Sequence, residues 1–312
     1  MISYKFKTDI GIVSFMAYHE ISSGKGLVVQ SIKKIAADPF FSLIEVAHIE
    51  DAVIREEVKK ILTTSNIRVS FGAHPAIFGQ KLNINSAEDD IRDKSVDILQ
   101  KLIDEAYQMN AESFVFISGP QSEKDSLENQ LELLKLSIDK LCSYSLKKSK
   151  EYGKDPIDMI LETFDHKPFA KNRLIGPTDI SVELAKSIRV KHKNFGLLLD
   201  LSHLPILGED YRDSLKMAKE YIKHIHIGNC ILKDKDHAAY GDEHPRFCID
   251  QGEIFTGQLA GFIKTLDKIG YLSNPKNAIS FEVKPLKGED PDITIAGSKR
   301  VLLSALRYAE LI

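Results

Sequence analysis

Short apolar segments rich in β-branched and aromatic residues alternate with longer amphipathic segments along the whole chain. The short runs are typical of buried strands, and apolar positions spaced three or four residues apart are typical of helices. The predicted strands span Gly11–Phe15, Ser42–Ala47, Ile67–Phe71, Ser113–Ser118, Ile157–Glu162, Phe195–Asp200, His224–Gly228 and Ala278–Val283. The predicted helices span Gly26–Ala37, Ala52–Thr63, Ala87–Met109, Asp125–Lys150, Pro177–His192, Tyr211–Lys223, Gln258–Ile269 and Ile293–Leu311.

A strand followed by a helix, repeated eight times, predicts parallel strands, because parallel neighbours need a crossover of about a dozen residues or more. Eight such units in 312 residues favour a closed (β/α)8 TIM barrel over an open doubly wound sheet, which has about five or six units. The sequence has no GxGxxG after its first strand and no GxxxxGK[ST], so neither nucleotide-binding motif is supported. No linker divides the chain, and residues 1–312 are predicted to form a single domain.

Charge and cysteine usage narrow the classes of function. The chain has 42 basic and 45 acidic residues, a net charge of −3, which argues against a protein that binds nucleic acid. The apolar stretch at residues 10–17 is too short to span a membrane and lacks the pattern of an export signal. Three cysteines without a CxxC motif suggest neither a disulfide framework nor a thiolate zinc site. We therefore expect a cytoplasmic protein.

Four apolar runs in the second half of the chain end in polar residues that can bind a metal. These residues are Glu162, Asp200, His226 and Glu282, on the last four predicted strands. Barrel enzymes carry their chemistry at the carboxyl ends of the strands, and consecutive strands are neighbours, so the four side chains should converge. Three crowded carboxylates repel one another unless a cation lies between them. One divalent ion per chain is expected, most simply Mn²⁺, with Mg²⁺, Co²⁺ or Zn²⁺ as alternatives.

The order of these residues resembles that of the xylose isomerase-like barrel superfamily. The resemblance rests on Asp200-Leu201-Ser202-His203 after the sixth strand and His224-Ile225-His226 in the seventh, flanked by Glu162 and Glu282. The superfamily includes tagatose 3-epimerase, inosose dehydratases and endonuclease IV. The resemblance implies that Glu162, Asp200, His226 and Glu282 ligate one catalytic metal, and that His203 contacts the substrate. It also implies that Glu162 and Glu282 act as acid and base.

The predicted function is a metal-dependent sugar isomerase or epimerase. A cation beside two glutamates suits proton transfer next to a carbonyl through an enediolate, where one carboxylate removes the proton and the other returns it. The alternative is that both glutamates are ligands only and a nearby His or Lys transfers the proton. The substrate would be a small sugar or polyol, and the lack of a Gly-rich phosphate cradle favours an unphosphorylated one.

Further polar residues lie in the loops expected at the barrel mouth. The long loop between residues 229 and 256 has the composition of a lid over the substrate. The candidate substrate-binding residues are His203, His244, Arg246, His166 and Lys284. Weaker candidates on the opposite side are Glu45, His48 and His74. Each of these candidates except His203 can equally be a solvated or hydrogen-bonded residue at the rim of the barrel, without a role in binding.

Three other functions remain open from the sequence. A metal-dependent lyase, either inosose dehydratase-like or a C-glycoside deglycosidase subunit with a small partner chain, begins with the same proton abstraction. An endonuclease IV-like DNA repair nuclease needs three zinc ions and extra histidines, but the fourth strand is followed by Gly119-Pro120 without a ligand. A non-enzymatic sugar-binding barrel would need no metal. The sequence does not indicate how many chains assemble, and a homo-oligomer is suggested by analogy with the superfamily alone.

Overall fold

The computed structural model describes residues 4–165 and 171–312, and it forms a closed barrel of eight parallel strands in chain order. The strands are β1 (Asp9–Val13), β2 (Leu43–Val46), β3 (Arg68–Gly72), β4 (Ser113–Phe116), β5 (Asp158–Glu162), β6 (Phe195–Asp200), β7 (Ile222–Ile227) and β8 (Ala278–Phe281). The predicted (β/α)8 barrel is therefore confirmed. Within the described ranges, no helix is both long and apolar enough to cross a membrane.

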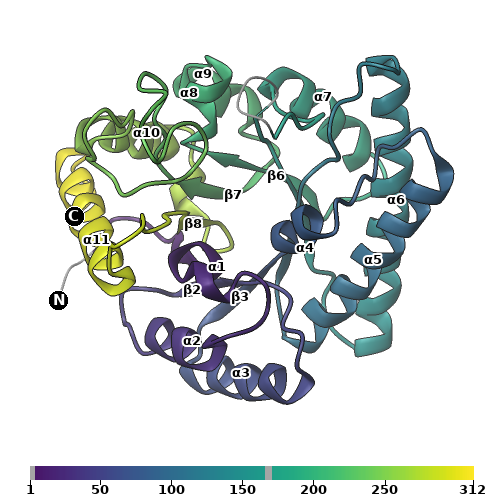
Figure 1. Ribbon diagram of the computed structural model, residues 1–312, viewed down its shortest axis with the longest axis horizontal. Helices are drawn as coiled ribbons and strands as arrows, with labels where there is room; N and C mark the ends of the chain where they lie inside the picture. Colours follow the sequence, from purple (N-terminus) through teal and green to yellow (C-terminus); the bar gives the residue numbers. More distant parts are fainter. Residues whose placement is uncertain (1–3, 166–170) are drawn as a thin grey trace.

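Helices surround the strands (Figure 1). The longer ones are α2 (Val28–Ala36), α3 (Ala52–Ser65), α5 (Asp89–Gln108), α6 (Leu127–Tyr152), α7 (Thr178–Arg189), α9 (Tyr211–Ala218), α10 (Thr256–Lys268) and α11 (Pro291–Tyr308). Shorter helical segments are α1 (Ser14–Ala17), η1 (His19–Ile21), α4 (His74–Gly79), α8 (His203–Leu207) and η2 (Tyr271–Ser273). The sequence did not predict α1, α4 or α8, because a helix of one or two turns shows no apolar period.

Most predicted boundaries differ from the observed ones by a few residues, and two of the differences have a clear structural cause. The first strand was expected to reach Phe15, but β1 ends at Val13 because Ser14 begins α1, where its carbonyl accepts from the Tyr18 amide at 2.9 Å. The helix predicted to reach Lys223 ends at Ala218, and β7 begins at Ile222, which pairs with Leu197 of β6. Pairing with the neighbouring strand thus outweighs the local helical pattern.

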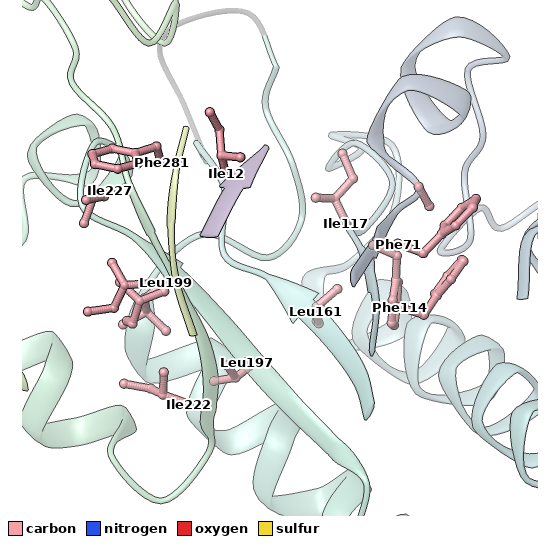
Figure 2. Close-up of a cluster of buried hydrophobic side chains, with 14 of the residues drawn as sticks. Ile12, Phe71, Phe114, Ile117, Leu161, Leu197, Leu199, Ile222, Ile227 and Phe281 are labelled. Carbon is pink, nitrogen blue, oxygen red and sulfur yellow. The ribbon is translucent and has the colours of Figure 1, made fainter. Parts of the chain in front are cut away.

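Alternate residues of each strand face opposite sides of the barrel wall. One set packs beneath the helices in a continuous apolar core, part of which Figure 2 shows, with Phe71, Phe114, Leu199 and Phe281 among its members. The other set faces the barrel interior, where three side chains form a separate apolar cluster: Val115, Ile160 and Leu198. The helices are therefore held by the outer set, which leaves the inner set available for other roles.

The remainder of the inner set includes several polar residues. Ser113 Oγ donates to Ser70 Oγ at 2.7 Å, and His224 Nε2 lies 2.9 Å from Ser280 Oγ. Branched apolar side chains usually fill such an interior, and a buried polar group is costly unless it is hydrogen-bonded. In this barrel, hydrogen-bonded polar side chains take some of the interior positions.

Candidate metal centre

Four side chains converge at the carboxyl ends of the last four strands. Glu162 ends β5, Asp200 ends β6, His226 is the penultimate residue of β7, and Glu282 directly follows β8. Each offers one ligand atom, and these atoms all lie within 4.8 Å of one another. All four residues are buried. The structure therefore brings together the four residues that the sequence singled out.

The hydrogen bonding of this group leaves oxygen atoms free for a cation. Asp200 Oδ1 accepts from the Ser202 amide at 2.8 Å, whereas Asp200 Oδ2 has no hydrogen-bond partner in residues 4–165 and 171–312. Among the described residues, neither carboxylate oxygen of Glu162 accepts a hydrogen bond; Glu162 Oε2 forms an ion pair with His74 Nε2 at 2.7 Å, and Glu162 Oε1 has no contact that close. Buried carboxylate oxygens without partners are costly unless a cation satisfies them. Three carboxylates and one imidazole suit a divalent ion with a preference for oxygen ligands.

The imidazole of His226 has its two nitrogen atoms in different surroundings. Nδ1 faces the carboxylates, 2.7 Å from Glu282 Oε2 and 3.8 Å from Glu162 Oε1. Nε2 faces the barrel interior, 2.9 Å from Glu45 Oε1. Nδ1 is therefore the nitrogen that this ring would present to a metal held by the carboxylates.

A second cluster adjoins the first on the side of the long loop. Ligand atoms of Asp200, His203 and His244 lie within 4.8 Å of one another. Asp242 joins them, since its Oδ1 is 3.2 Å from His203 Nε2 and 2.9 Å from His244 Nε2. Its Oδ2 forms an ion pair with Lys171. The loop after β7, which is held by bridges of Ile231 with Tyr240 and Gly252, thereby contributes two buried polar residues to the mouth of the barrel.

Charge balance in the two clusters depends on the histidines. Burial favours the neutral form of Glu282, but His244 and His226 outweigh it and lower its pKa to about 2. Burial raises the pKa of Asp200, and Glu282 adds to this effect. Burial opposes the charged form of His226, yet Glu45, Glu282 and Glu162 hold its pKa well above the usual value. The carboxylates require nearby positive charge, which protonated histidines or a divalent cation can supply.

The candidate substrate-binding residues differ in the partners of their side chains. His203 and His244 are buried between Asp200 and Asp242, and their rings lie 5.5 Å apart. Lys284 forms an ion pair with Glu243 at 2.6 Å. Arg246 pairs with Glu289 at 3.0 Å, with 46% of its side chain exposed. His166 lies outside the described residues.

Three residues that join or contact these clusters are absent from the predicted site residues or are only weakly indicated by the sequence. Asp242 lies two residues before His244, and this Asp-x-His spacing was the signal available in the sequence. His74 begins α4 and lies against Glu162. Glu45 is completely buried in β2, where an acidic residue amid apolar neighbours was the only indication. His48, the other weak candidate, pairs with Glu105 on α5 instead, at 2.6 Å.

Comparison with known proteins agrees with this architecture. The family model described as xylose isomerase-like TIM barrel matches residues 35–302. No curated protein matches the chain in sequence. Among solved structures, a D-tagatose 3-epimerase-like protein is similar with a TM-score of 0.72 at 19% identity, covering 97% of this chain and 98% of the other.

Two further structures show the range of proteins with this fold. D-psicose 3-epimerase from Clostridium cellulolyticum H10 has a TM-score of 0.65 at 17% identity, with 97% and 98% of the two chains covered. An AP endonuclease of family 2 from Brucella melitensis has a TM-score of 0.65 at 16% identity, with 93% and 97% covered. At these identities the structures show a shared fold. The family model covers most of the chain, and this protein therefore belongs to the xylose isomerase-like TIM barrel family.

Proposed function

We propose that this protein is a metal-dependent sugar isomerase or epimerase, which moves a proton on a carbon next to a carbonyl through an enediolate. The observation that carries the proposal is the buried group of Glu162, Asp200, His226 and Glu282, whose ligand atoms lie within 4.8 Å of one another. The similar structures of sugar 3-epimerases support the substrate class. A small sugar or polyol, a cytoplasmic location and Mn²⁺ are parts of the same proposal.

The two glutamates are suited to exchange protons with a substrate. Glu162 and Glu282 come from β5 and β8, which are not neighbours in the barrel, so they approach a bound molecule from different directions. Each has a histidine nitrogen 2.7 Å from a carboxylate oxygen, His74 for Glu162 and His226 for Glu282, which orients the carboxylate. One carboxylate removes the proton and the other returns it. A bound divalent ion would supply positive charge beside the carbonyl oxygen and stabilise the enediolate.

The second cluster provides groups that contact substrate hydroxyls. His203 Nδ1 donates to the Thr163 carbonyl at 2.8 Å, so its Nε2 faces Asp242. The ring of Phe164 packs against His203 with centroids 4.4 Å apart, which gives the cluster one apolar side. We assign substrate contacts to His203 and His244. Arg246 and Lys284 are engaged in ion pairs with Glu289 and Glu243, and they take no part in the proposal.

The test combines metal analysis with solvent deuterium exchange. The protein, incubated with Mn²⁺ in D₂O, is screened by NMR against ketoses and inositol ketones for deuterium at carbons next to the carbonyl. We expect exchange in the wild type and a loss of at least about 100-fold in Glu162→Gln and in Glu282→Gln, because each removes a group that transfers the proton. Glu105→Gln is the matched control, since Glu105 is equally buried but lies on α5 beside His48.

The outcomes separate the proposed chemistry from its rivals. Exchange without isomerised product but with loss of water or of an aglycone would identify a lyase. A protein that holds about one divalent ion yet exchanges no deuterium across the panel would contradict the proposal. Two ions per chain would indicate that Asp200, His203 and His244 also bind a metal.

A further inference from the structure

Glu45 is a buried carboxylate that the proposed chemistry does not use. It lies in β2, whereas its partners lie in β7, and these strands are separated in the closed barrel by β1 and β8. The carboxylate therefore reaches across the barrel interior rather than along the wall. Both Glu45 and its partners are almost completely inaccessible to solvent. An apolar side chain would fill this space at lower cost than a carboxylate.

One oxygen of Glu45 contacts both histidines of β7. Glu45 Oε1 lies 2.9 Å from His226 Nε2 and 3.0 Å from His224 Nε2. His224 Nε2 is also 2.9 Å from Ser280 Oγ, which holds that ring against β8. The backbone carbonyl of Glu45 accepts from Ser14 Oγ at 2.7 Å, so the residue is fixed at its other end as well. Glu45 is thus held in one position relative to the His226 ring.

We propose that Glu45 is the positioning residue that presents Nδ1 of His226 to the metal. A carboxylate accepts hydrogen bonds and donates none, so when Nδ1 of His226 binds a metal, the ring carries its proton on Nε2 and donates it to Glu45. The ring cannot then rotate to point Nε2 at Glu162 and Glu282 without losing this hydrogen bond. A carboxylate behind a metal-binding imidazole fixes the ring and makes the other nitrogen a better ligand. This inference rests on the metal site of the proposed function.

The first measurement needs no metal. Without a metal, both ring nitrogens of His226 face a carboxylate, Nδ1 that of Glu282 at 2.7 Å and Nε2 that of Glu45 at 2.9 Å. The protonated ring donates from both nitrogens, and the hydrogen bond of Nε2 to a buried carboxylate should shift its NMR signal downfield and slow its exchange with water. In metal-free protein labelled with ¹⁵N-histidine, the signal is assigned by its loss in His226→Gln. We expect it in the wild type and in Glu105→Gln, and we expect it to be lost in Glu45→Leu.

The second measurement is Co²⁺ affinity, obtained by competition with a chelator. Removal of such an outer partner weakens metal binding by about 10- to 100-fold. We expect a loss in this range for Glu45→Leu and a smaller one for Glu45→Gln, whose amide oxygen can still accept from Nε2. Glu105→Gln should bind Co²⁺ within about twofold of the wild type. The Tm of each metal-free variant shows whether the fold persists, and Glu45→Gln, which keeps the shape of the side chain, remains informative if Glu45→Leu does not fold.

The outcomes distinguish failure of this inference from failure of the proposed function. Wild-type Co²⁺ affinity in Glu45→Leu and Glu45→Gln would overturn the positioning role alone. A wild-type protein that binds no Co²⁺ would overturn the proposed function and this inference together. A Nε2 proton of His226 that is unchanged in Glu45→Leu would also contradict the positioning role, because the hydrogen bond on which it depends would not exist.

Discussion

At the scale of single residues, the partner of a side chain decides its role more than its type does. His203 and His48 both follow a barrel strand closely, yet His203 faces Asp242 in the candidate site and His48 faces Glu105 of α5. Arg246 and His244 are two residues apart in one loop, but Arg246 pairs outward with Glu289 while His244 is buried beside Asp242. The residue types in this loop therefore indicate correctly that it is polar, but they do not indicate which of its side chains face the candidate site.

The His48–Glu105 pair should make the free energy of unfolding depend on pH. The hydrogen bond to Glu105 raises the pKa of His48 above its usual value, against the opposing effect of partial burial. A histidine whose pKa is raised on folding contributes stability that is fully present below its unfolded-state pKa of about 6.5 and is lost as the pH rises through the higher folded-state value. The pair is partly exposed, with 39% of the His48 side chain accessible, so its contribution should stay below about 1 kcal/mol.

Urea unfolding of the wild type and of His48→Gln at several pH values measures this contribution. We expect the wild type to be the more stable at pH 5.5 and the difference to shrink by pH 9. A difference that grows with pH would show that the sign of this contribution is wrong.

At the scale of elements, the candidate site lies at the carboxyl ends of the strands, and close contacts of the backbone keep the segments around it together. Gly228 directly follows β7. A Cβ atom added there would lie 2.7 Å from His244 Nδ1, 3.0 Å from the Glu282 carbonyl and 3.2 Å from Ser202 Oγ. The glycine therefore allows the end of β7, the segment after β6 and the long loop to meet at one point.

Gly228→Ala should push these three segments apart. We expect the free energy of unfolding to fall by about 1–3 kcal/mol, as for other overpacked sites, and Mn²⁺ affinity to fall with it. Thermal unfolding and metal titration test this. Gly257→Ala in α10 is the matched control, because nothing lies within 4 Å of its added Cβ, and it should leave the metal affinity unchanged. Equal metal affinity in both variants would show that the close contact at Gly228 does not position the site.

At the scale of the whole molecule, closure of the barrel gathers groups that are distant in the chain. Glu45 and His226 are separated by 181 positions and meet only because β1 pairs with β8. The barrel interior therefore carries buried carboxylates and histidines where apolar side chains usually provide stability. A bound cation should relieve the repulsion among these carboxylates and stabilise the fold.

Removal of the metal tests this expectation. A ligand that binds only the folded state stabilises it by about 2.7 kcal/mol when its concentration is a hundredfold above its Kd. We therefore expect the Tm to fall when Mn²⁺ is removed with EDTA and to recover when Mn²⁺ is added back. The double variant Glu162→Gln/Glu282→Gln should show no response to either treatment. A wild-type Tm that is indifferent to Mn²⁺ and EDTA would argue against the metal site.

The eight strand–helix units and the four polar strand ends can be predicted from the sequence. Apolar periodicity and side-chain alternation are local properties, and barrel topology then makes Glu162, Asp200, His226 and Glu282 neighbours. Local patterns could not determine which residues of β2 and of the long loop join them. Barrel closure decided that Glu45 lies behind His226, and the path of the loop decided that Asp242 and His244 turn inward while Arg246 turns outward. These contacts depend on positions in space that segments far apart in the chain acquire only when the barrel is complete.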